Sequence, residues 1–453
     1  MSEQLLTGWA RTAPTRAGVM TPAKSADEVR EALAGAHPRG VIARGLGRSY
    51  GDAAQNAGGE VLTITGMQRI RSIDRSAGTV TADGGVSLDR VIDAVLPLGW
   101  FPPVVPGTRF VTLGGAIASD VHGKNHHRDG AFCRYVESLV LQAPRGERLE
   151  LSAEAAPHEF WATAGGMGLT GVVLEARLSL IPVETSWITE DVERADGLDA
   201  AMTRMQQEDH RDRYSVAWID CLARGRGFGR SVLMRGDHAG RGELPAAQRA
   251  APLDRPRRAR LAAPRGLPSG LLRREAAAAF NELYFRRAPR RARRLVPLDR
   301  FFFPLDAIRG WNRVYGPRGF LQYQFVVPFG QEDALRAVLE RLSRGPAVPA
   351  LAVLKRLGAE QGLISFPMPG WTLAVDMPAG TPGLAEQLDA LDELVADVGG
   401  RVYLAKDSRL RPELVPRMYP QLERWREIRA QLDPGGVMTS DLSRRLGLLA
   451  SRA

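Results

Sequence analysis

Three glycine-rich segments within the first 182 residues constrain this chain more than any other feature of its sequence. They read RGLGRSYGD at residues 44–52, PGTRFVTLGGAIASDVHGKNHH at residues 106–127 and GGMGLTGVVLEARLSLIP at residues 165–182. Glycine allows sharp turns and close approach to a ligand, and successive backbone N–H groups in such loops bind anions. We therefore expect loops that line a diphosphate, with hydroxyl donors from Ser49, Thr108 and Thr112. Plain tight turns are the alternative.

Two common nucleotide-binding motifs do not fit these segments. Gly45, Gly47 and Gly51 follow a predicted strand with the spacing G-x-G-x-x-x-G, and neither a clear helix nor a later acidic residue follows. A Rossmann dinucleotide site needs both of these features. No G-K-[ST] occurs at the offset that a P-loop requires. The glycine loops therefore point to another nucleotide-binding fold.

Hydrophobic periodicity predicts a mixed α+β chain. In the first part, the pattern predicts helices at residues 21–33 and 87–96. It predicts strands at residues 40–45, 60–65 and 78–85. In the second part, they are strands at residues 320–329 and 371–378 and a helix at residues 383–398. We predict a nucleotide-binding domain at residues 1–183, a substrate-binding domain at residues 184–400 with an antiparallel sheet flanked by helices, and a segment at residues 401–453 that returns to the first domain.

Composition narrows the class of protein. Of 453 residues, 44% are hydrophobic and 25% are charged, as in soluble globular proteins. No apolar run reaches the ~18 residues that span a bilayer, and the first residues lack the apolar core of a secretory signal. Cys133 and Cys221 are too few for a disulfide framework. We expect neither a membrane span nor a signal peptide.

The net charge of +10 is concentrated in one stretch. Residues 255–294 contain thirteen arginines against Glu275 and Glu282, so the rest of the chain is close to neutral. Pro and Gly in this stretch predict a mobile basic excursion near residues 240–298, with one short helix at residues 275–285. It is either a solvated loop or a surface that attracts an anionic membrane or a phosphorylated ligand. No aromatic-interleaved or finger-like motif accompanies the charge, so nucleic acid is not an expected partner.

Lysine is rare in this chain. Of 61 Lys plus Arg residues, only Lys24, Lys124, Lys355 and Lys406 are lysines. Because arginine replaces lysine wherever either cation serves, the remaining lysines are candidates for roles that need a compact, titratable ammonium. Chance retention is the alternative for each of them.

The glycine segments resemble the FAD domain of the vanillyl-alcohol oxidase, or para-cresol methylhydroxylase (PCMH), flavoprotein superfamily. With FWATAGGMGLTG, WNRVYGPRGFLQYQFVVP, SFPMPGW and VYLAKDSR, the chain is similar to the decaprenylphosphoryl-β-D-ribose 2′-oxidase family. The resemblance implies a two-domain PCMH-type fold and FAD-dependent oxidation of the ribose 2′-hydroxyl of a polyprenyl-phosphate sugar. The 2′-keto product would pass to a short-chain reductase, which completes epimerisation to the arabinose donor for cell-wall arabinan. The enzyme would lie peripherally on the cell membrane.

The resemblance also implies the cofactor site. A histidine that often carries the flavin covalently in the superfamily is replaced by Arg48, which implies non-covalent FAD. The implied cofactor-binding residues are Gly45, Gly47, Arg48, Ser49, Tyr50, Gly51, Gly107, Thr108, Thr112, Gly115, Ala118, His122, Val172, Tyr403 and Lys406.

Catalysis is expected to depend on Lys406, His122 and Lys124. Alcohol oxidation requires a hydride acceptor and a group that takes or orients the hydroxyl proton, and an ammonium beside the flavin stabilises the negative charge that it gains. His126 and His127 could bind a metal with His122, but no carboxylate or cysteine completes such a set, so no metal is expected. The implied substrate-binding residues are Tyr50, Lys124, Gln322, Gln324, Lys355, Thr372 and Ala374.

Four positions depart from the family. Thr372 and Ala374 stand where the family commonly has Asn and Cys, Phe302 replaces a Tyr, and Val216 replaces a Ser. These changes make the pocket more apolar and remove the thiol target of nitroaromatic inhibitors.

Two alternative functions remain open, a paralogous FAD oxidase of another sugar or alditol and a non-catalytic membrane-surface binding protein.

Overall fold

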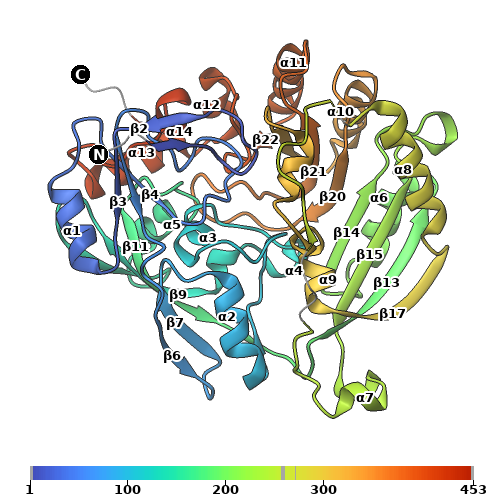
Figure 1. The fold of residues 1–453 in the computed structure, drawn as a ribbon, viewed down its shortest axis with the longest axis horizontal. Helices are drawn as coiled ribbons and strands as arrows, with labels where there is room; N and C mark the ends of the chain where they lie inside the picture. Colours follow the sequence, from blue (N-terminus) through green and yellow to red (C-terminus); the bar gives the residue numbers. More distant parts are fainter. Residues whose placement is uncertain (1–3, 257–260, 271, 450–453) are drawn as a thin grey trace.

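The computed structural model describes residues 4–256, 261–270 and 272–449 and shows helices combined with several separate sheets. Figure 1 shows the first and last parts of the chain side by side, and the eight-stranded sheet of the middle part next to them. The predicted α+β class is confirmed.

A small parallel sheet carries the first glycine loop. Its strands are in the order β3 (Val19–Pro22), β5 (Glu60–Thr63) and β4 (Val41–Arg44). Helix α1 (Ala26–Ala34) connects β3 to β4, and the Ser25 hydroxyl caps it by accepting the Glu28 N–H at 3.2 Å. The predicted strands are confirmed, and so is the helix, except that its predicted first residues, 21 and 22, belong to β3. The loop at residues 45–51 leaves directly from the end of β4.

A five-stranded antiparallel sheet supports the other two glycine segments. Its order is β10 (Arg148–Leu151), β9 (Val136–Gln142), β11 (Val172–Ser179), β7 (Thr79–Asp83) and β6 (Ile70–Asp74). The short helices around it are α2 (Leu88–Val95), α3 (Leu113–Ala118), α4 (His126–Asp129) and α5 (Pro157–Thr163). Helix α3 contacts β11, so the second glycine segment packs on the strand that the third segment forms.

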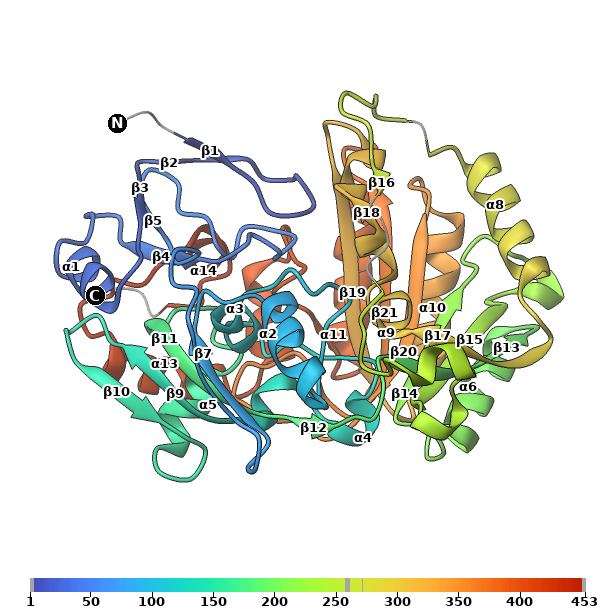
Figure 2. The ribbon, with the colours of Figure 1, turned by 60° about the horizontal axis from the view of Figure 1, so that its bottom comes forward.

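The predicted antiparallel sheet of the middle part is confirmed, with eight strands. Their order is β17 (Arg291–Pro297), β13 (Trp187–Ala195), β15 (Ser231–His238), β14 (Tyr214–Ile219), β20 (Leu351–Leu357), β21 (Gly370–Pro378), β19 (Phe320–Pro328) and β22 (Arg401–Val402). Helices α6 (Leu198–Glu208), α10 (Glu332–Arg344) and α11 (Leu384–Asp397) pack on one face (Figure 2). Side chains alternate along a strand, so Tyr323 and Phe325 join the core under these helices while Gln322 and Gln324 point to the other face.

The last part of the chain packs on the first part. After β22, helices α12 (Val415–Met418), α13 (Leu422–Leu432) and α14 (Asp441–Arg445) follow. Helix α13 contacts α5, where Trp425 Nε1 donates to the Ala162 carbonyl at 2.9 Å, and Met438 bridges to Val41 of β4. We propose the division into residues 1–183, 184–400 and 401–453 as the domain organisation, although β22 of the last segment still belongs to the eight-stranded sheet.

The expectation of a mobile excursion over residues 240–298 is wrong for its last part. Residues 291–297 form the edge strand β17, which pairs with β13 along its whole length. The acidic residues of β13 explain this, because Arg294 pairs with Glu190 at 2.7 Å and Arg291 with Asp191 at 3.3 Å. The predicted helix is confirmed as α8 (Arg274–Arg287). Residues 257–260 and 271 lie outside the described residues.

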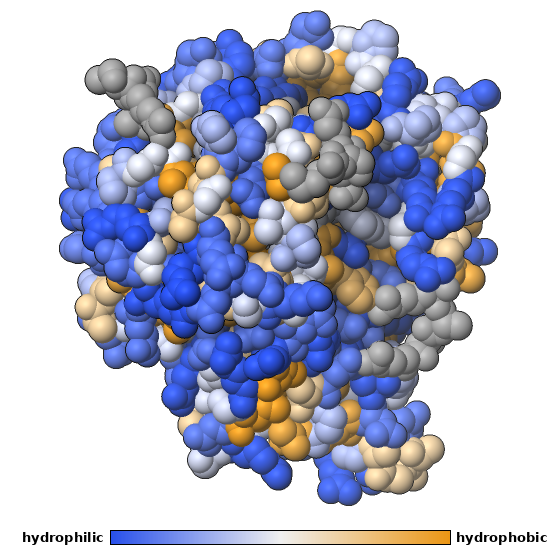
Figure 3. Space-filling view, turned by 60° about the vertical axis from the view of Figure 1, so that its left-hand side comes forward, coloured by the Kyte–Doolittle hydropathy of each residue, from blue (hydrophilic) through white to orange (hydrophobic). Residues whose placement is uncertain are grey.

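The smaller strands and helices include β1 (Gln4–Leu6), β2 (Thr15–Ala17), β8 (Trp100–Phe101), β12 (Ile181–Pro182), α7 (Ala246–Arg249), β16 (Leu261–Ala262), α9 (Leu298–Phe302) and β18 (Ile308–Arg309). On the side formed by the first part of the chain, the surface is mostly hydrophilic with scattered apolar groups (Figure 3). Within the described ranges, no helix combines the length and apolarity that crossing a membrane requires.

Candidate active site

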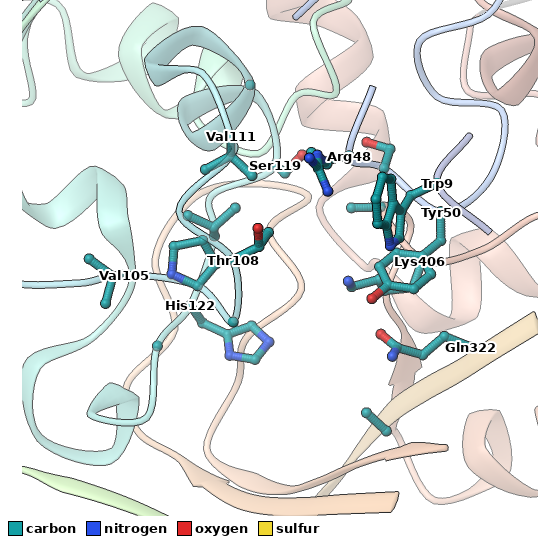
Figure 4. A pocket seen from close by; sticks show the side chains of 18 of the residues that line it. Trp9, Arg48, Tyr50, Val105, Thr108, Val111, Ser119, His122, Gln322 and Lys406 are labelled. Carbon is teal, nitrogen blue, oxygen red and sulfur yellow. The ribbon is translucent and has the colours of Figure 1, made fainter. Parts of the chain in front are cut away.

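A cavity of about 530 Å³ lies between the glycine loops and the face of the eight-stranded sheet opposite α6, α10 and α11. In Figure 4, His122 and Thr108 lie on one side of it, and Tyr50, Lys406 and Gln322 lie on the other. The cavity therefore joins residues from opposite ends of the chain, such as Trp9 and Lys406. The sheet contributes Glu190, Val216, Trp218, Met234, Gln322, Gln324, Leu351, Val353, Lys355 and Ala374.

Glycine is required in the first loop because other chain segments approach it closely. A Cβ at Gly45 would lie 2.3 Å from Thr112 Oγ1, and one at Gly51 would lie 1.8 Å from the Asp407 carbonyl oxygen. Gly47 has φ +62°, which favours glycine. The loop is thus packed against both the second glycine segment and the segment that carries Lys406.

The hydroxyl groups expected to bind a diphosphate are partly engaged within the protein. Thr108 Oγ1 donates to Asp306 Oδ1 at 2.8 Å, so its proton points away from the cavity. Thr112 Oγ1 accepts the Gly115 N–H at 3.2 Å and caps α3. The backbone N–H groups of Gly47 and Ser49, by contrast, have no hydrogen-bond acceptor among the described residues. In the first loop, these two backbone N–H groups are therefore available to an anion.

Two cation–aromatic contacts define the wall near the first loop. The Arg48 guanidinium lies 3.9 Å from the centroid of the Trp9 ring, and Lys406 Nζ lies 3.5 Å from the centroid of the Tyr50 ring. The Tyr50 N–H donates to the Ala405 carbonyl at 2.9 Å. This backbone bond brings the first loop and the Lys406 segment together.

His122 links the second glycine segment to the sheet. Its Nε2 lies 3.0 Å from Gln324 Nε2, and its Nδ1 lies 3.3 Å from Lys355 Nζ. Gln324 also contacts Thr372 Oγ1 at 3.4 Å, and Thr372 donates to the Phe325 carbonyl. Burial and the neighbouring Lys355 charge hold the pKa of His122 well below its usual range, so the imidazole is neutral.

The three lysines of the cavity are all perturbed by their surroundings. Burial lowers the pKa of Lys124 to about 8, and the ammonium donates to the Phe301 carbonyl and lies 4.1 Å from the centroid of the Phe301 ring. Burial and Lys124 lower the pKa of Lys355 to about 7. Burial also lowers the pKa of Lys406 to about 7, against the opposing effect of Asp376. These amines change charge near neutral pH, which is typical of functional sites.

Most residues singled out in the sequence lie along this cavity. They are Gly45, Gly47, Arg48, Ser49, Tyr50, Gly107, Thr108, Thr112, Gly115, Ala118, His122, Lys124, Gln322, Gln324, Lys355, Ala374, Tyr403 and Lys406. Gly51, Val172 and Thr372 do not line it. Val172 packs in the core and its neighbour Val173 lines the cavity, because successive side chains of β11 point to opposite faces. Thr372 lies behind Gln324.

Sequence reasoning missed other cavity residues. Trp9 lies far from any motif, and Trp218, Glu190 and Arg300 carry no local signal that connects them to the glycine loops. Sequence reasoning also missed Asp376, which is hydrogen-bonded to the lining residue Gln322 and lies two residues from Ala374, on the same face of β21. That spacing was the signal that could have revealed it.

Within the described part of the chain, no group of three or more His, Cys, Asp or Glu side chains is arranged to hold a metal ion. The donors present fit FAD instead. The first loop offers unpaired backbone N–H groups, and a Cβ at Gly107 would meet no atom within 4 Å, so this loop faces open space. The cavity then continues from the loops to the lysine-bearing sheet.

Comparisons with known proteins agree with this geometry. Residues 17–152 match an FAD binding domain family, and residues 378–446 match a D-arabinono-1,4-lactone oxidase family. The chain is 41% identical, over 98% of its length and 97% of the relative, to decaprenylphosphoryl-beta-D-ribose oxidase of Mycolicibacterium smegmatis. It is 43% identical, over 80% of its length and all of the relative, to an uncharacterized protein of Streptomyces coelicolor. Cytokinin dehydrogenase 2 of Arabidopsis thaliana is 27% identical over 39% of this chain and 36% of the plant protein.

The predicted cofactor and enzyme class are thus confirmed: the protein is an FAD-dependent oxidoreductase. The cavity between glycine loops and an antiparallel sheet, and the near full-length similarity, lead to one assignment. The chain belongs to the decaprenylphosphoryl-β-D-ribose oxidase family of FAD-dependent oxidoreductases.

Proposed function

We propose that this protein oxidises the 2′-hydroxyl of a polyprenylphosphoryl ribose to the 2′-keto sugar. The observation that carries the proposal is the cluster of His122, Lys355 and Lys406 where the glycine loops meet the antiparallel sheet. The relative that covers nearly the whole chain is an oxidase of decaprenylphosphoryl-β-D-ribose. The cavity has the size of a typical small-molecule site.

The chain's own groups would position the hydroxyl and balance charge. When FAD is bound, it supplies the hydride acceptor for alcohol oxidation. The neutral imidazole of His122 has one unprotonated ring nitrogen, and a substrate hydroxyl that displaces Gln324 or Lys355 from it can donate to that nitrogen and give up its proton. Lys406, when protonated, supplies a positive charge in a buried setting, where it stabilises developing negative charge strongly. Lys124 lies on the His122 side of the cavity and completes the positive field.

Substrate recognition would come from the sheet. Gln322 and Gln324 present amides to the cavity, and Lys355 provides the cation for the phosphate. The α8 end of the cavity is lined by aromatic rings, with those of Trp218 and Tyr284 4.7 Å apart, beside Glu190 and Arg300. A lipid chain leaving the sugar phosphate would find apolar contacts there.

We further propose that the α8 end of the cavity faces an anionic membrane. Phe280, Leu283 and Tyr284 are exposed on α8, and the helix ends in Arg286 and Arg287. Exposed apolar side chains next to arginines are typical of interfacial helices. A short-chain reductase that reduces the 2′-keto sugar would then complete epimerisation for arabinan synthesis.

Vesicle co-sedimentation tests the membrane proposal. The double variant Phe280→Ser/Leu283→Ser should lose binding to phosphatidylglycerol vesicles, whereas Leu5→Ser, an exposed leucine on the first part of the chain, should bind as the parent does. Equal binding of both variants would contradict the proposed surface.

Turnover tests the substrate. A short-chain polyprenylphosphoryl ribose should be oxidised at least about 100-fold more efficiently than free ribose or a panel of alditols. Val216, Phe302 and Ala374 line the cavity and favour the second candidate, a paralogous oxidase of another sugar or alditol. Preference for a soluble polyol would establish that candidate and reject the first one. A protein purified without bound flavin, and without turnover of any sugar, would favour a non-catalytic binding protein.

A further inference from the structure

Asp376 is a buried carboxylate directly behind the wall that carries Lys406 and Tyr50. It lies on β21 opposite Gln322 of β19, and only 1% of its surface is exposed. Gln322 Nε2 donates to Asp376 Oδ1 at 2.5 Å. Figure 4 shows Gln322 beside Tyr50 and Lys406 on the same side of the cavity. The Gln322 side chain thus lies between this carboxylate and the cavity.

Most buried carboxylates of the described residues are paired with arginine, although Asp120 is held by the Ser365 hydroxyl and the Cys133 N–H instead. Asp220 pairs with Arg230 at 2.8 Å, and Asp433 pairs with Arg429 at 2.5 Å. Asp376 likewise has no Arg or Lys of the described residues within ion-pair distance, and its hydrogen-bonding neighbours are the neutral side chains of Gln322 and Tyr315. A buried carboxylate without an ion pair is costly unless a nearby positive charge compensates it. Lys406, which lies on the cavity side of Gln322, can supply this positive charge.

We propose that Asp376 is a positioning residue for Lys406. Its negative charge keeps the Lys406 amine protonated, and its hydrogen bond to Gln322 holds the wall against which Lys406 and Tyr50 lie. The inference rests on the proposed function only in assigning Lys406 to the reaction.

The electrostatics of the pair support this role. Burial lowers the pKa of Lys406 to about 7, while Asp376 raises it and Lys355 lowers it further. Burial raises the pKa of Asp376 to about 7, while Gln322, Lys406 and Tyr315 lower it. Linkage makes the effect reciprocal, so each charge stabilises the other equally. The other titratable or charged groups around the pair are Tyr50, Tyr315, Lys355, His122 and Arg48.

Of these surrounding groups, Lys355 is the one that changes charge near pH 7. Burial raises the pKa of both tyrosines and lowers that of His122, and the guanidinium keeps its charge. A test must therefore measure the titration of Lys406 separately from that of Lys355.

The scarcity of lysine makes that separation possible. With [13Cε]lysine labelling, the holoprotein gives four resonances, for Lys24, Lys124, Lys355 and Lys406, which single Lys→Arg variants assign. Asp376→Asn keeps an oxygen acceptor for Gln322 but removes the charge. We expect the titration midpoint of Lys406 to fall by about one pH unit or more, while that of Lys24 does not move. The control Asp392→Asn removes a carboxyl whose pKa is also raised to about 7, but which lies on α11 beside Arg409, and should leave Lys406 unchanged.

An unchanged Lys406 midpoint in folded Asp376→Asn protein would overturn the proposal. If that variant does not fold, Lys406→Gln provides the reciprocal test, because the carboxyl of Asp376 must then stay protonated to higher pH. Isotope-edited infrared spectroscopy of [13C]aspartate-labelled protein measures this, and an unshifted carboxyl titration would again contradict the proposal. Both measurements need no substrate, so failure to oxidise polyprenylphosphoryl ribose would reject the proposed function without affecting this result.

Discussion

Lys406 Nζ lies 3.5 Å from the centroid of the Tyr50 ring, although 355 residues separate them in the sequence. Arg445 holds the two segments together, since it donates to Asp52, two residues after Tyr50, and to Asp407, next to Lys406. The missing side chain of Gly51 lets the Asp407 carbonyl approach. One wall of the site is therefore assembled by three distant parts of the chain.

Lys406→Met should abolish most of the oxidation activity. Removing a preorganised charge where negative charge develops costs about 3 kcal/mol, which corresponds to about a 100-fold lower kcat. Stopped-flow measurement of flavin reduction by substrate gives this rate directly. The control Lys24→Met, at an exposed lysine of the first part, should reduce flavin at the parental rate. Near-parental reduction in Lys406→Met would transfer the role to His122 or Lys124.

FAD should be held without a covalent bond. The Arg48 side chain packs on Trp9, and a guanidinium is not a flavin attachment group. Acid precipitation should leave all of the flavin in the supernatant as free FAD, which absorbance and mass spectrometry quantify. Flavin that remains in the protein pellet would show a covalent link elsewhere in the chain.

Arg445→Met should destabilise the fold and weaken flavin retention. The substitution leaves Asp52 and Asp407, both buried, without their cation, which typically costs about 3–5 kcal/mol. Thermal unfolding with and without added FAD measures the loss. Arg417→Met is the matched control, because Arg417 forms exposed pairs with Glu393 and Asp397 that contribute at most about 1 kcal/mol. Equal effects of the two substitutions would mean that the Arg445 contacts do not clamp the site.

Binding of the anionic substrate should weaken as the pH rises. Burial and Lys124 lower the pKa of Lys355 to about 7, so its amine is charged below this pH and neutral above it. KM should therefore increase by up to about tenfold per pH unit above pH 7, until the pKa of the complex is reached. Lys355→Arg keeps a positive charge at all these pH values, so its KM should not change with pH. The control Lys24→Arg should show the same increase of KM with pH as the parent protein. A flat profile in the parent protein would indicate that Lys355 does not meet the phosphate.

Nitroaromatic inhibitors that trap a pocket thiol should form no covalent adduct with this protein. Ala374 lines the cavity where the family commonly has cysteine, and both cysteines of the chain are buried away from it. Burial raises the pKa of both thiols, so neither is a reactive thiolate. Intact-mass analysis after turnover with inhibitor should show unmodified protein, and an adduct should form in Ala374→Cys. An adduct on Cys133 or Cys221 in the parent would contradict this prediction.

The sequence alone determined the features that depend on local chemistry. Glycine spacing indicated the nucleotide loops, alternation on residues 320–328 placed Gln322 and Gln324 on one face, and the scarcity of lysine singled out Lys124, Lys355 and Lys406. Each of these follows from the backbone conformation or periodicity of a short segment, which its own residues largely determine.

Only the tertiary structure decided which of these segments meet. The register of β19 against β21 places Asp376 behind Gln322, the packing of the N-terminal segment places Trp9 under Arg48, and the return of α14 places Arg445 between Asp52 and Asp407. It also showed that residues 291–297 form a strand, because the acidic side chains of β13 neutralise their arginines. Such contacts depend on strand register and on packing between segments far apart in the chain, which no local pattern of residues encodes.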